Sequence, residues 1–485
     1  MPELPLLEGV LKYIKENNIL FCMPGHKNGK GFYNTSIGRE FVNNILKFDI
    51  TEVDGVDNLH NQKGIILDAS RHLRDFYGSK KSYFLVNGST SGNMIMLFSS
   101  FNEGDKILVE RNCHNSIFNS IIMRKLKPVY LKNIISKRLN APISIDLEHF
   151  LQVLKENADA KGIVVTYPNY YGICSNLKFI MQEAKKYNMK VLVDCAHGSH
   201  FGVHPDLPES AVKLGADMVV TSAHKTLSSL TQSAYLHVNN DRDIDKADFY
   251  FDAFSSTSPS YISLCSMDYA RFYLEKYGYR DYEGLIRRNQ HYRNRINSIR
   301  GLSIIDKEDI VKFNRNCIRE KNMMANVWNI DLTRYIINLD RNYSGDLLLK
   351  YLRKSGIQCE MSDGSNVILI FSPFNKEEEY EVLYNTLKNC NLEHLKYERA
   401  NIIEYEIPEI KMLPYEAVNA EKQIVDLEDS LGKVSGANII PYPPGVPILL
   451  IGELINKDIL EIIRYYSKNG VDLMGVEDNK IKVIK

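Results

Sequence analysis

Three short segments of the sequence combine residue types that could do chemistry, and each follows a short apolar run. The first, Asn87–Asn93, reads Asn-Gly-Ser-Thr-Ser-Gly-Asn and precedes an apolar stretch with helical spacing. A Gly/Ser/Thr turn that opens a helix presents N–H groups, hydroxyls and the positive end of the helix dipole together, which suits a phosphate. The turn is not a P-loop, because the G-x-x-x-x-G-K-[S/T] spacing is absent. An ordinary strand-to-helix turn is the alternative interpretation.

The other two segments are Asp194-Cys-Ala-His-Gly198 and Ser222-Ala-His-Lys-Thr226. A carboxylate at the end of a buried strand is costly unless it is paired, so Asp194 is either a structural hydrogen-bond acceptor or the counter-charge of a buried cation. Lys225 is either a surface lysine or a partly desolvated one, whose lowered pKa would leave it nucleophilic. Pyridoxal 5′-phosphate (PLP) needs a helix N-terminus for its phosphate, a carboxylate for its ring nitrogen and an amine for its aldehyde. The three segments together therefore indicate a PLP site.

The elements that must position these segments are short strands alternating with amphipathic helices. Seven apolar runs are expected to be strands: Ser82–Val86, Lys106–Val109, Pro128–Leu131, Gly162–Thr166, Lys190–Asp194, Asp217–Thr221 and Ser233–Val238. Five stretches between them have helical spacing: Asn93–Phe101, Ser116–Lys125, Asp146–Asn157, Leu177–Tyr187 and Glu209–Leu214. This alternation predicts a doubly wound α/β domain, whose ligand lies at the carboxyl ends of the parallel strands.

A second, smaller α/β pattern follows a long helical stretch. Residues 262–300 are expected to be helical and carry several arginines, which indicate either an anion or nucleic-acid patch or, as we favour, the solvated face of a linking helix. Tyr335–Leu339 and Val367–Ser372 are expected to be strands, with helices at Ser344–Ser355 and 376–393 and a closing helix at Lys457–Lys468.

Composition excludes several classes of protein. The 485 residues hold 60 Lys+Arg and 60 Asp+Glu, so the chain lacks the basic excess of a nucleic-acid binder. The eight cysteines include no C-x-x-C pair and are expected to be free thiols. Neither a signal peptide nor a run of 18 apolar residues is visible, so we expect no membrane association and a cytoplasmic location.

Three nearby histidines, His197, His200 and His204, raise the alternative of a metal site. His200 and His204 have the i, i+4 spacing of helical zinc ligands. Gly198 and Gly202 interrupt the segment, and no Glu stands where a metalloprotease base would. We therefore predict no metal.

Asp194-x-Ala-His-Gly with Ser222-x-His-Lys225 resembles the fold-type I PLP-dependent enzymes, and more narrowly the bacterial ornithine/lysine/arginine decarboxylases. Further matching segments are residues 23–29, 49–60, 111–116, 166–172, 255–261 and 441–447, the last followed by Gly452-Glu453. The resemblance is to the short form, without an N-terminal wing domain. It implies a mostly parallel seven-stranded sheet, a smaller α/β domain and a C-terminal domain. The expected divisions are an arm at 1–50, the large PLP-binding domain at 51–300, the small domain at 301–395 and the C-terminal domain at 396–485.

The resemblance also implies roles for individual residues. Lys225 would form a Schiff base with the cofactor, Asp194 would pair with the ring nitrogen, His114 would stack on the ring's outer face and Ala196 would pack beneath it. The residues expected to reach the phosphate are Ser89, Thr90, Ser91, Ser222 and His224, and His197 completes the set on this chain. Thr257 would line the site of the partner subunit, because the family's active sites lie at a homodimer interface. The expected catalytic residues are Lys225, His224, His114 and Asp194.

The implied activity is decarboxylation of arginine, lysine or ornithine to the corresponding polyamine-type amine, with Lys225 or His224 returning a proton to Cα. The candidates for binding the distal cation are Glu52, Asp54, Asp57 and Glu453, with solvated or N-capping carboxylates as the alternative. A rival on the same fold is an aminotransferase or lyase, which commonly uses an arginine of the C-terminal part for the α-carboxylate; no motif places one here. A non-catalytic PLP-binding protein is a further alternative, against which the intact Asp194, His114 and Lys225 argue.

Overall fold

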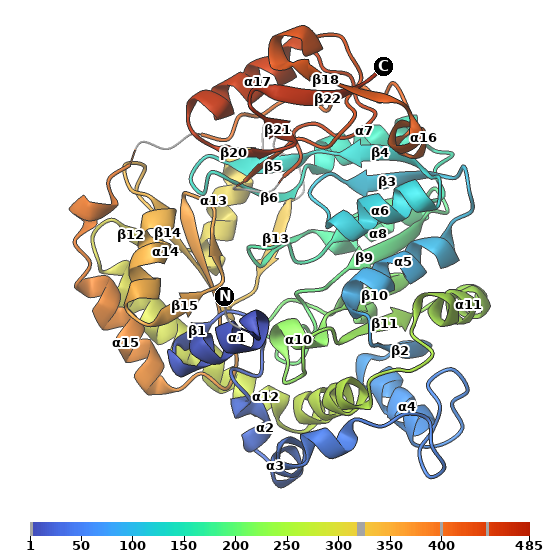
Figure 1. Ribbon diagram of the computed structural model, residues 1–485, viewed down its shortest axis with the longest axis vertical. Coiled ribbons are helices and arrows are strands. Elements are labelled where there is room, and N and C mark those ends of the chain that lie inside the picture. Colours follow the sequence, from blue (N-terminus) through green and yellow to red (C-terminus); the bar gives the residue numbers. More distant parts are fainter. Residues whose placement is uncertain (1–2, 318–324, 398–400, 443–445) are drawn as a thin grey trace.

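The computed structural model describes residues 3–317, 325–397, 401–442 and 446–485. A large α/β domain, a smaller α/β domain and a C-terminal domain can be followed in Figure 1. Among these described segments, no helix has both the length and the apolar content needed to cross a membrane.

The large domain is built on one seven-stranded sheet in the order β2-β11-β10-β9-β7-β3-β4. Its strands are β2 (Lys81–Leu85), β3 (Lys106–Glu110), β4 (Lys127–Leu131), β7 (Gly162–Thr166), β9 (Lys190–Asp194), β10 (Met218–Thr221) and β11 (Ala234–Val238). All seven predicted runs are strands of this sheet, with bounds that differ by at most one residue. β11 runs antiparallel to β10 and to β2, while β10, β9, β7, β3 and β4 are parallel neighbours.

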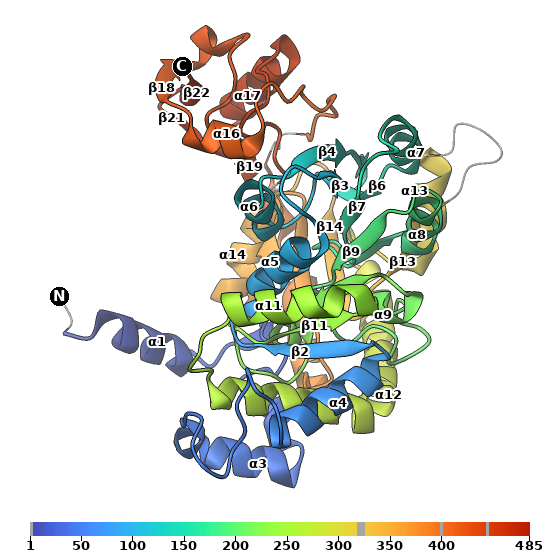
Figure 2. The same cartoon turned by 90° about the vertical axis from the view of Figure 1, so that its right-hand side faces the viewer.

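Helices cover both faces of this sheet (Figure 2). α5 (Gly88–Ser100) packs against α6 (Asn115–Met123) and α11 (Ile244–Phe254) on one face, and α7 (Leu147–Glu156) lies beside α8 (Leu177–Lys185) on the other. α5 is apolar on nearly every side because it lies under α11 and over the central strands, with Ile95, Met96 and Leu97 fully buried. It begins five residues before the predicted start at Asn93, so the Gly/Ser/Thr turn is its first helical turn.

The small domain holds a four-stranded antiparallel sheet in the order β12-β14-β17-β16. These strands are β12 (Leu302–Ile304), β14 (Arg334–Leu339), β16 (Met361–Ser362) and β17 (Asn366–Ile370), covered by α14 (Gly345–Lys354) and α15 (Glu377–Lys388). The N-terminal arm joins this domain, because β1 (Ile19–Phe21) pairs in parallel with β15 (Ile357–Cys359). A further pair, β8 (Ile173–Ser175) with β13 (Val327–Ile330), connects the two domains and was not predicted.

Three arginines of α12 (Tyr261–Asn297) contact the small domain, whereas Arg287 is 75% exposed and pairs with Glu283 of the same helix. Arg288 forms an ion pair with Glu377 at 2.8 Å, and Arg295 binds Glu381. Arg293 is 1% exposed and lies over the ring of Tyr335 at 5.4 Å. The interpretation as a solvated face is therefore wrong for Arg288, Arg293 and Arg295, which hold α12 against α15 and β14, and it is right for the exposed Arg287.

The C-terminal domain has a core of its own around α17 (Lys457–Lys468), whose Ile459, Leu460 and Ile463 are buried. β18 (Lys422–Asp426), β22 (Lys480–Ile484) and β21 (Val476–Glu477) form its three-stranded sheet. α16 (Pro414–Asn419) brings this domain against α6 of the large domain. The expected domain boundaries stay predictions. Residues 443–445 of the Pro/Gly-rich segment at 441–447 lie outside the described residues.

Candidate active site

The predicted site residues meet at the carboxyl ends of neighbouring strands. Asp194 is the last residue of β9, and Lys225 lies on the one-turn helix α10 (Ala223–Thr226) directly after β10. His114 caps α6, four residues after β3 ends. Because parallel strands end at one edge of a sheet, these residues face a common space.

Asp194 is a buried carboxylate without a cationic side chain bound to it. It is 3% exposed; its Oδ2 accepts a hydrogen bond from Nδ2 of Asn93 at 2.8 Å, and its Oδ1 accepts one from the N–H of Ala196 at 3.1 Å. No ion-pair partner within 4.0 Å is found for it in the described part of the chain. A buried charge is costly unless a cation or hydrogen bonds compensate it, so this site suits a protonated ring nitrogen.

Asn93 is a candidate site residue that the sequence interpretation missed. Its Nδ2 donates to Asp194 and also to Oγ of Ser116, both at 2.8 Å. Oγ of Ser116 in turn lies 2.8 Å from Nδ1 of His114. A buried asparagine in an otherwise apolar helix is the signal that could have identified it.

The histidines of the site are held with lowered proton affinity. Burial lowers the pKa of His114; the charge of Asp194 opposes this and that of Lys225 adds to it. Burial likewise lowers the pKa of His224, whose Nδ1 lies 2.8 Å from the carbonyl of Ser233. A carbonyl can only accept, so the neutral His224 carries its proton on Nδ1.

The phosphate end of the predicted site has open donors. The first turn of α5 contains Ser89, Thr90 and Ser91, and Oγ of Ser91 donates to the carbonyl of Gly88 at 2.9 Å. Oγ of Ser222 is buried and has no hydrogen-bond partner. A buried hydroxyl is normally satisfied, so Ser222 is suited to a ligand oxygen. These residues fit the phosphate, and Asp194 fits the ring nitrogen.

Lys225 is a buried amine in contact with His197. Its Nζ lies 3.1 Å from Nε2 of His197. Burial lowers the pKa of Lys225; Asp194 and Glu360 oppose this shift and Arg334 adds to it. A lowered pKa increases the uncharged, nucleophilic fraction of the amine.

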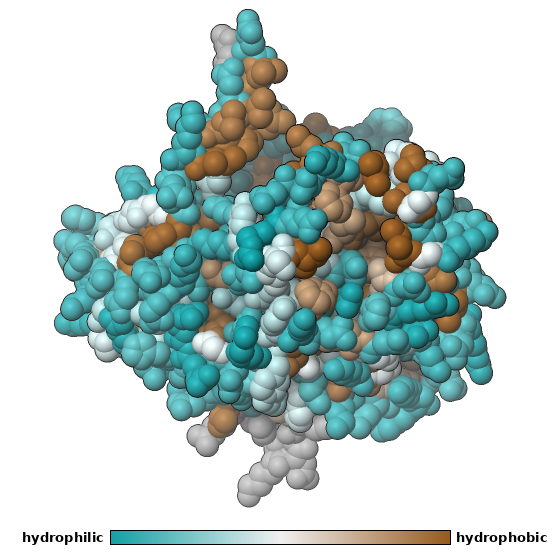
Figure 3. All heavy atoms as spheres, turned by 90° about the horizontal axis from the view of Figure 1, so that it is seen from below, coloured by the Kyte–Doolittle hydropathy of each residue, from teal (hydrophilic) through white to brown (hydrophobic). Residues whose placement is uncertain are grey.

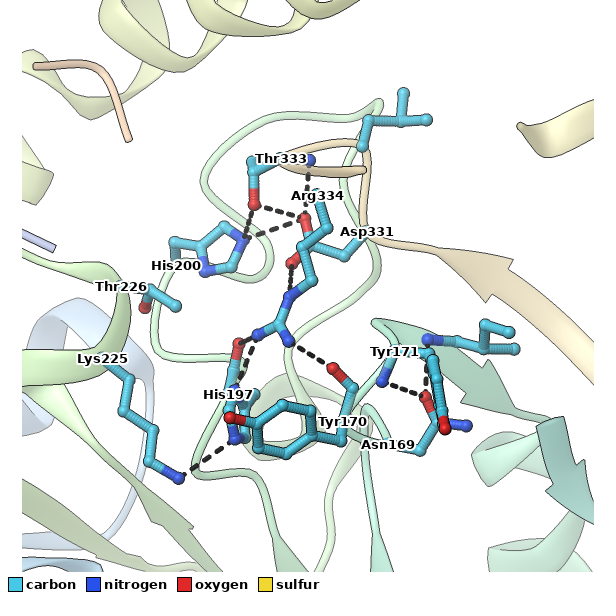
Figure 4. A network of polar contacts seen from close by, with 12 residues as sticks. Asn169, Tyr170, Tyr171, His197, His200, Lys225, Thr226, Asp331, Thr333 and Arg334 are labelled. Carbon is cyan, nitrogen blue, oxygen red and sulfur yellow. Dashed lines mark hydrogen bonds and ion pairs between the residues drawn. The ribbon is translucent and has the colours of Figure 1, made fainter. Parts of the chain in front are cut away.

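Beyond His197 the contacts continue into the small domain (Figure 4). Arg334, at the start of β14, donates to Nδ1 of His197 at 2.8 Å and to the carbonyl of Tyr170 at 2.7 Å. Its Nε donates to Asp331 at 3.2 Å. Tyr170 donates its hydroxyl proton to Glu360 at 2.6 Å. No pattern in the sequence pointed to Arg334, Asp331 or Glu360, because their contacts depend on how the two domains pack.

Arg334 does not provide the free guanidinium that an aminotransferase would use for the substrate carboxylate. Its Nε and both terminal nitrogens already donate to Asp331, Tyr170 and His197, and it is 2% exposed. Within the described ranges, it is the arginine whose charge acts on Lys225.

The segment at 23–29 lies against the helix that carries Lys225. The N–H of Gly25 donates to the carbonyl of His224 at 2.8 Å. A Cβ at Gly25 would lie 2.5 Å from the backbone of Thr226 and Leu227, so only glycine allows this approach. Nζ of Lys27, 1% exposed, donates to the carbonyls of Cys22 and Ile370.

Three of the four predicted acidic candidates have other positions or partners. Asp57 caps α4 (Ile65–Tyr77), accepting hydrogen bonds from backbone N–H groups that include those of Gly64 and Ile66. Asp54 is exposed, and Glu453 is fully buried in a two-point ion pair with Arg111. Oε1 of Glu52 is buried without a hydrogen-bond partner.

Two further sequence expectations concern Thr257 and the nearby histidines. Thr257 is exposed on the loop between α11 and α12, so its role at a partner's site stays a prediction. His200 contacts Asp331 at 3.2 Å, and the described side chains include no cluster of three or more metal-ligating groups.

Comparison with known proteins adds the following findings. Residues 4–379 match the model of the Orn/Lys/Arg decarboxylase major domain, and residues 398–471 match that of its C-terminal domain. An arginine decarboxylase of Halalkalibacterium halodurans is 34% identical over 99% of this chain and 97% of its own length. One from Bacillus anthracis is 33% identical over 100% of this chain and 97% of its own.

Solved structures show the fold. The constitutive lysine decarboxylase of Escherichia coli superposes with a TM-score of 0.78 at 21% identity, covering 99% of this chain and 82% of that one. Serine palmitoyltransferase from S. paucimobilis, with PLP bound, superposes with a TM-score of 0.58 at 13% identity, covering 76% of this chain and 86% of that one. The predicted fold class, fold-type I with a mostly parallel seven-stranded sheet, is confirmed.

Proposed function

This chain belongs to the Orn/Lys/Arg decarboxylase family and is a decarboxylase, and from that premise we propose that it acts with PLP and that its substrate is arginine. Four relatives named arginine decarboxylase are 31–34% identical over at least 93% of this chain. Relatives named lysine decarboxylase are 22–24% identical.

The observation that carries the PLP proposal is the pair of Asp194 and Lys225. Asp194 is a buried carboxylate to which no cationic side chain of the described residues is bound. Lys225 is a buried amine whose pKa the charge of Asp194 raises. When bound, PLP would supply the electron sink for the pair released as the bond from Cα to the carboxylate breaks. Asp194 would hold a proton at the ring nitrogen, and the first turn of α5 with Ser222 would bind the phosphate.

Lys225 is better placed than His224 to return a proton to Cα. The proton of neutral His224 lies on Nδ1 and is committed to the carbonyl of Ser233. Its other ring nitrogen can therefore accept a hydrogen bond but cannot donate one. Nζ of Lys225 carries exchangeable protons in both of its charge states, so we assign it the protonation of Cα.

Glu360 is the residue we propose for the distal cation of the substrate. Besides Asp194, it is the carboxylate whose charge acts on Lys225. Its oxygens accept from the hydroxyl of Tyr170 at 2.6 Å and from the N–H of Met23 at 2.9 Å, which fix its position. A guanidinium can donate to both oxygens of one carboxylate, which favours arginine.

We also propose a homodimer that covers the helix α1 (Pro5–Lys15). None of its residues is buried; Leu6 is 81%, Leu7 54% and Ile14 61% exposed. Apolar side chains gather along this projecting arm in Figure 3. An isolated helix of 11 residues is marginal in water, so a partner surface is needed to stabilise it. Replacing Leu7 and Leu11 with serine is expected to shift the dimer toward monomer in analytical ultracentrifugation, and an unchanged mass would refute this role.

The activity is tested on purified protein with PLP, offered arginine, lysine and ornithine separately. Arginine is expected to give carbon dioxide and the matching amine fastest, and the Lys225→Ala protein is expected to give neither. A keto acid product, or a Lys225→Ala protein as fast as the wild type, would overturn the proposal. Faster release of carbon dioxide from lysine or ornithine would overturn the substrate assignment alone.

A further inference from the structure

A continuous line of polar contacts runs from Lys225 into the small domain (Figure 4). It passes from Nζ of Lys225 to Nε2 of His197 (3.1 Å), from Nδ1 of His197 to Arg334 (2.8 Å) and from Nε of Arg334 to Asp331 (3.2 Å). Lys225 and His197 belong to the large domain, whereas Arg334 and Asp331 precede or begin β14 of the small domain. The reactive amine is therefore two side chains away from the other domain.

The chemistry of these groups determines where the proton of His197 lies. A guanidinium only donates hydrogen bonds, so Nδ1 of His197 must accept from Arg334. The neutral imidazole then carries its single proton on Nε2, the nitrogen that faces Lys225. Nε2 can donate to Nζ only if Nζ has a lone pair. An ammonium at the same place would direct its own N–H against the N–H of His197.

We propose that Arg334 is a positioning residue that fixes the tautomer of His197, so that Nε2–H of His197 donates to Nζ of Lys225 and keeps this amine uncharged. This inference rests on the proposed function for its purpose, because an uncharged Lys225 is the form that can attack a carbonyl carbon. Arg334 is buried and bound at three sides, so the guanidinium acts through His197 and does not bind the substrate.

Burial favours the uncharged form of the amine at Lys225. The titratable or charged groups around Lys225 and His197 are Asp194, Glu360, His114, His224, Arg334 and Tyr170, whose ring lies 4.9 Å from that of His197. Burial lowers the pKa of Lys225, against the opposing charges of Asp194 and Glu360. Burial and the charge of Arg334 lower the pKa of His197 far below its usual value. His197 therefore stays neutral, as the tautomer argument requires.

The structure holds Arg334 in place from both domains. Asp331, fully buried, accepts from Nε of Arg334 and from the hydroxyl and N–H of Thr333, at 2.7 Å and 2.9 Å. The N–H of Asp331 also donates to the carbonyl of Gly172, a residue of the large domain, at 2.8 Å. A Cβ at Gly172 would lie 2.8 Å from Cδ of Arg334, so glycine leaves room for the arginine stem. This gives the Tyr170-Tyr-Gly172 segment a purpose that its sequence did not show.

The test measures the charge state of Lys225 in the full-length protein freed of PLP. Trace acetic anhydride is applied between pH 6 and pH 10, and mass spectrometry compares acetylation of Lys225 with that of the exposed Lys457. Wild-type Lys225 is expected to label with a lower pH midpoint than Lys457. Arg334→Met is expected to raise the midpoint of Lys225 by about one pH unit, or about tenfold slower labelling at pH 7. Arg295→Met, which removes another interdomain arginine, is the matched control and is expected to leave it unchanged.

A double-mutant cycle separates the action through His197 from a direct effect of charge. In a His197→Phe background, Arg334→Met is expected to shift the midpoint by less than half as much. A wild-type Lys225 that labels no faster than Lys457 at neutral pH would overturn the inference. So would an unshifted midpoint in Arg334→Met, or the same shift in the His197→Phe background.

A second pair of variants answers the same question if Arg334→Met does not fold. His197→Phe removes the hydrogen-bond donor and is expected to raise the pH midpoint of Lys225 acetylation. His197→Gln keeps an amide donor, and its midpoint is expected to stay near that of the wild type. Equal midpoints in the two variants would overturn the inference. The same samples distinguish this inference from the proposed function. Wild-type protein that develops no visible PLP absorbance would contradict the PLP proposal, while the labelling result still decides the role of Arg334.

Discussion

The ion pair of Arg111 and Glu453 joins the large domain to the C-terminal domain, and its removal gives a prediction that can be worked out from the structure. Arg111 follows β3 and is 3% exposed, and Glu453 is fully buried. The guanidinium donates to both carboxylate oxygens, at 2.6 Å and 2.8 Å. It also donates to the carbonyls of Pro447 and Ile448, each at 3.2 Å.

Arg111→Ala would leave the carboxylate of Glu453 buried without its cation. Breaking a buried ion pair from one side costs about 3–5 kcal/mol. Since each 1.4 kcal/mol is about a factor of ten, the C-terminal domain should open about 10² to 4 × 10³ times more often. The matched control is Arg464→Ala, whose partner Glu428 is 57% exposed; solvent screens an exposed pair, so its removal changes stability little.

Hydrogen–deuterium exchange of α17 measures this opening without assuming that the whole chain unfolds in one step. Amides of α17 should exchange about 10² to 4 × 10³ times faster in Arg111→Ala than in the wild type, and at most about fivefold faster in Arg464→Ala. Because Arg111 precedes His114 by three residues, the same variant is expected to bind PLP less tightly. Exchange in Arg111→Ala that is no faster than in Arg464→Ala would refute the reasoning.

Two further predictions concern the site itself, and a third concerns the buried Glu110 at the end of β3. Asp194→Asn places an amide where Asn93 already donates, and it removes the negative charge beside the ring nitrogen of PLP. The kcat should therefore fall at least about a hundredfold. A kcat within threefold of the wild type would contradict the pairing of Asp194 with the ring nitrogen. Glu360→Gln keeps the shape and loses the charge, so KM for arginine should rise about 10- to 100-fold with kcat less affected; an unchanged KM would rule out Glu360 as the cation site. Burial raises the pKa of Glu110 from 4.5 to about 7, so its contribution to stability is complete below about pH 4.5 and is lost as the pH rises to about 7. Chemical denaturation at several pH values measures the free energy of unfolding. Across that range, the free energy of unfolding of the wild type should fall by up to about 1.4 kcal/mol per pH unit relative to that of Glu110→Gln. The same pH dependence in both proteins would refute this prediction.

The alternation of short strands and helices was predictable because it depends on local sequence. Residues that face a covered parallel sheet are apolar over four or five consecutive positions, and this pattern does not depend on what the chain packs against. The few elements predicted for the small and C-terminal domains followed the same rules, with bounds within a few residues, but the strands of the C-terminal domain were not predicted. Strands such as β8 and β13 were missed, because three- and four-residue strands carry too little pattern and are stabilised by partners about 150 residues away.

The sequence by itself determined the ends of the strands and therefore the place of Asp194, Lys225 and the first turn of α5. These residues follow their own strands directly, so the sheet topology brings them to one edge. The tertiary structure alone decided the partners across domains: Arg334 on His197, Glu360 on Tyr170 and Glu453 on Arg111. Such contacts join residues 137 to 342 positions apart, and they depend on how preformed domains dock. No local propensity encodes that docking, since it is set by the shape and charge of complete surfaces.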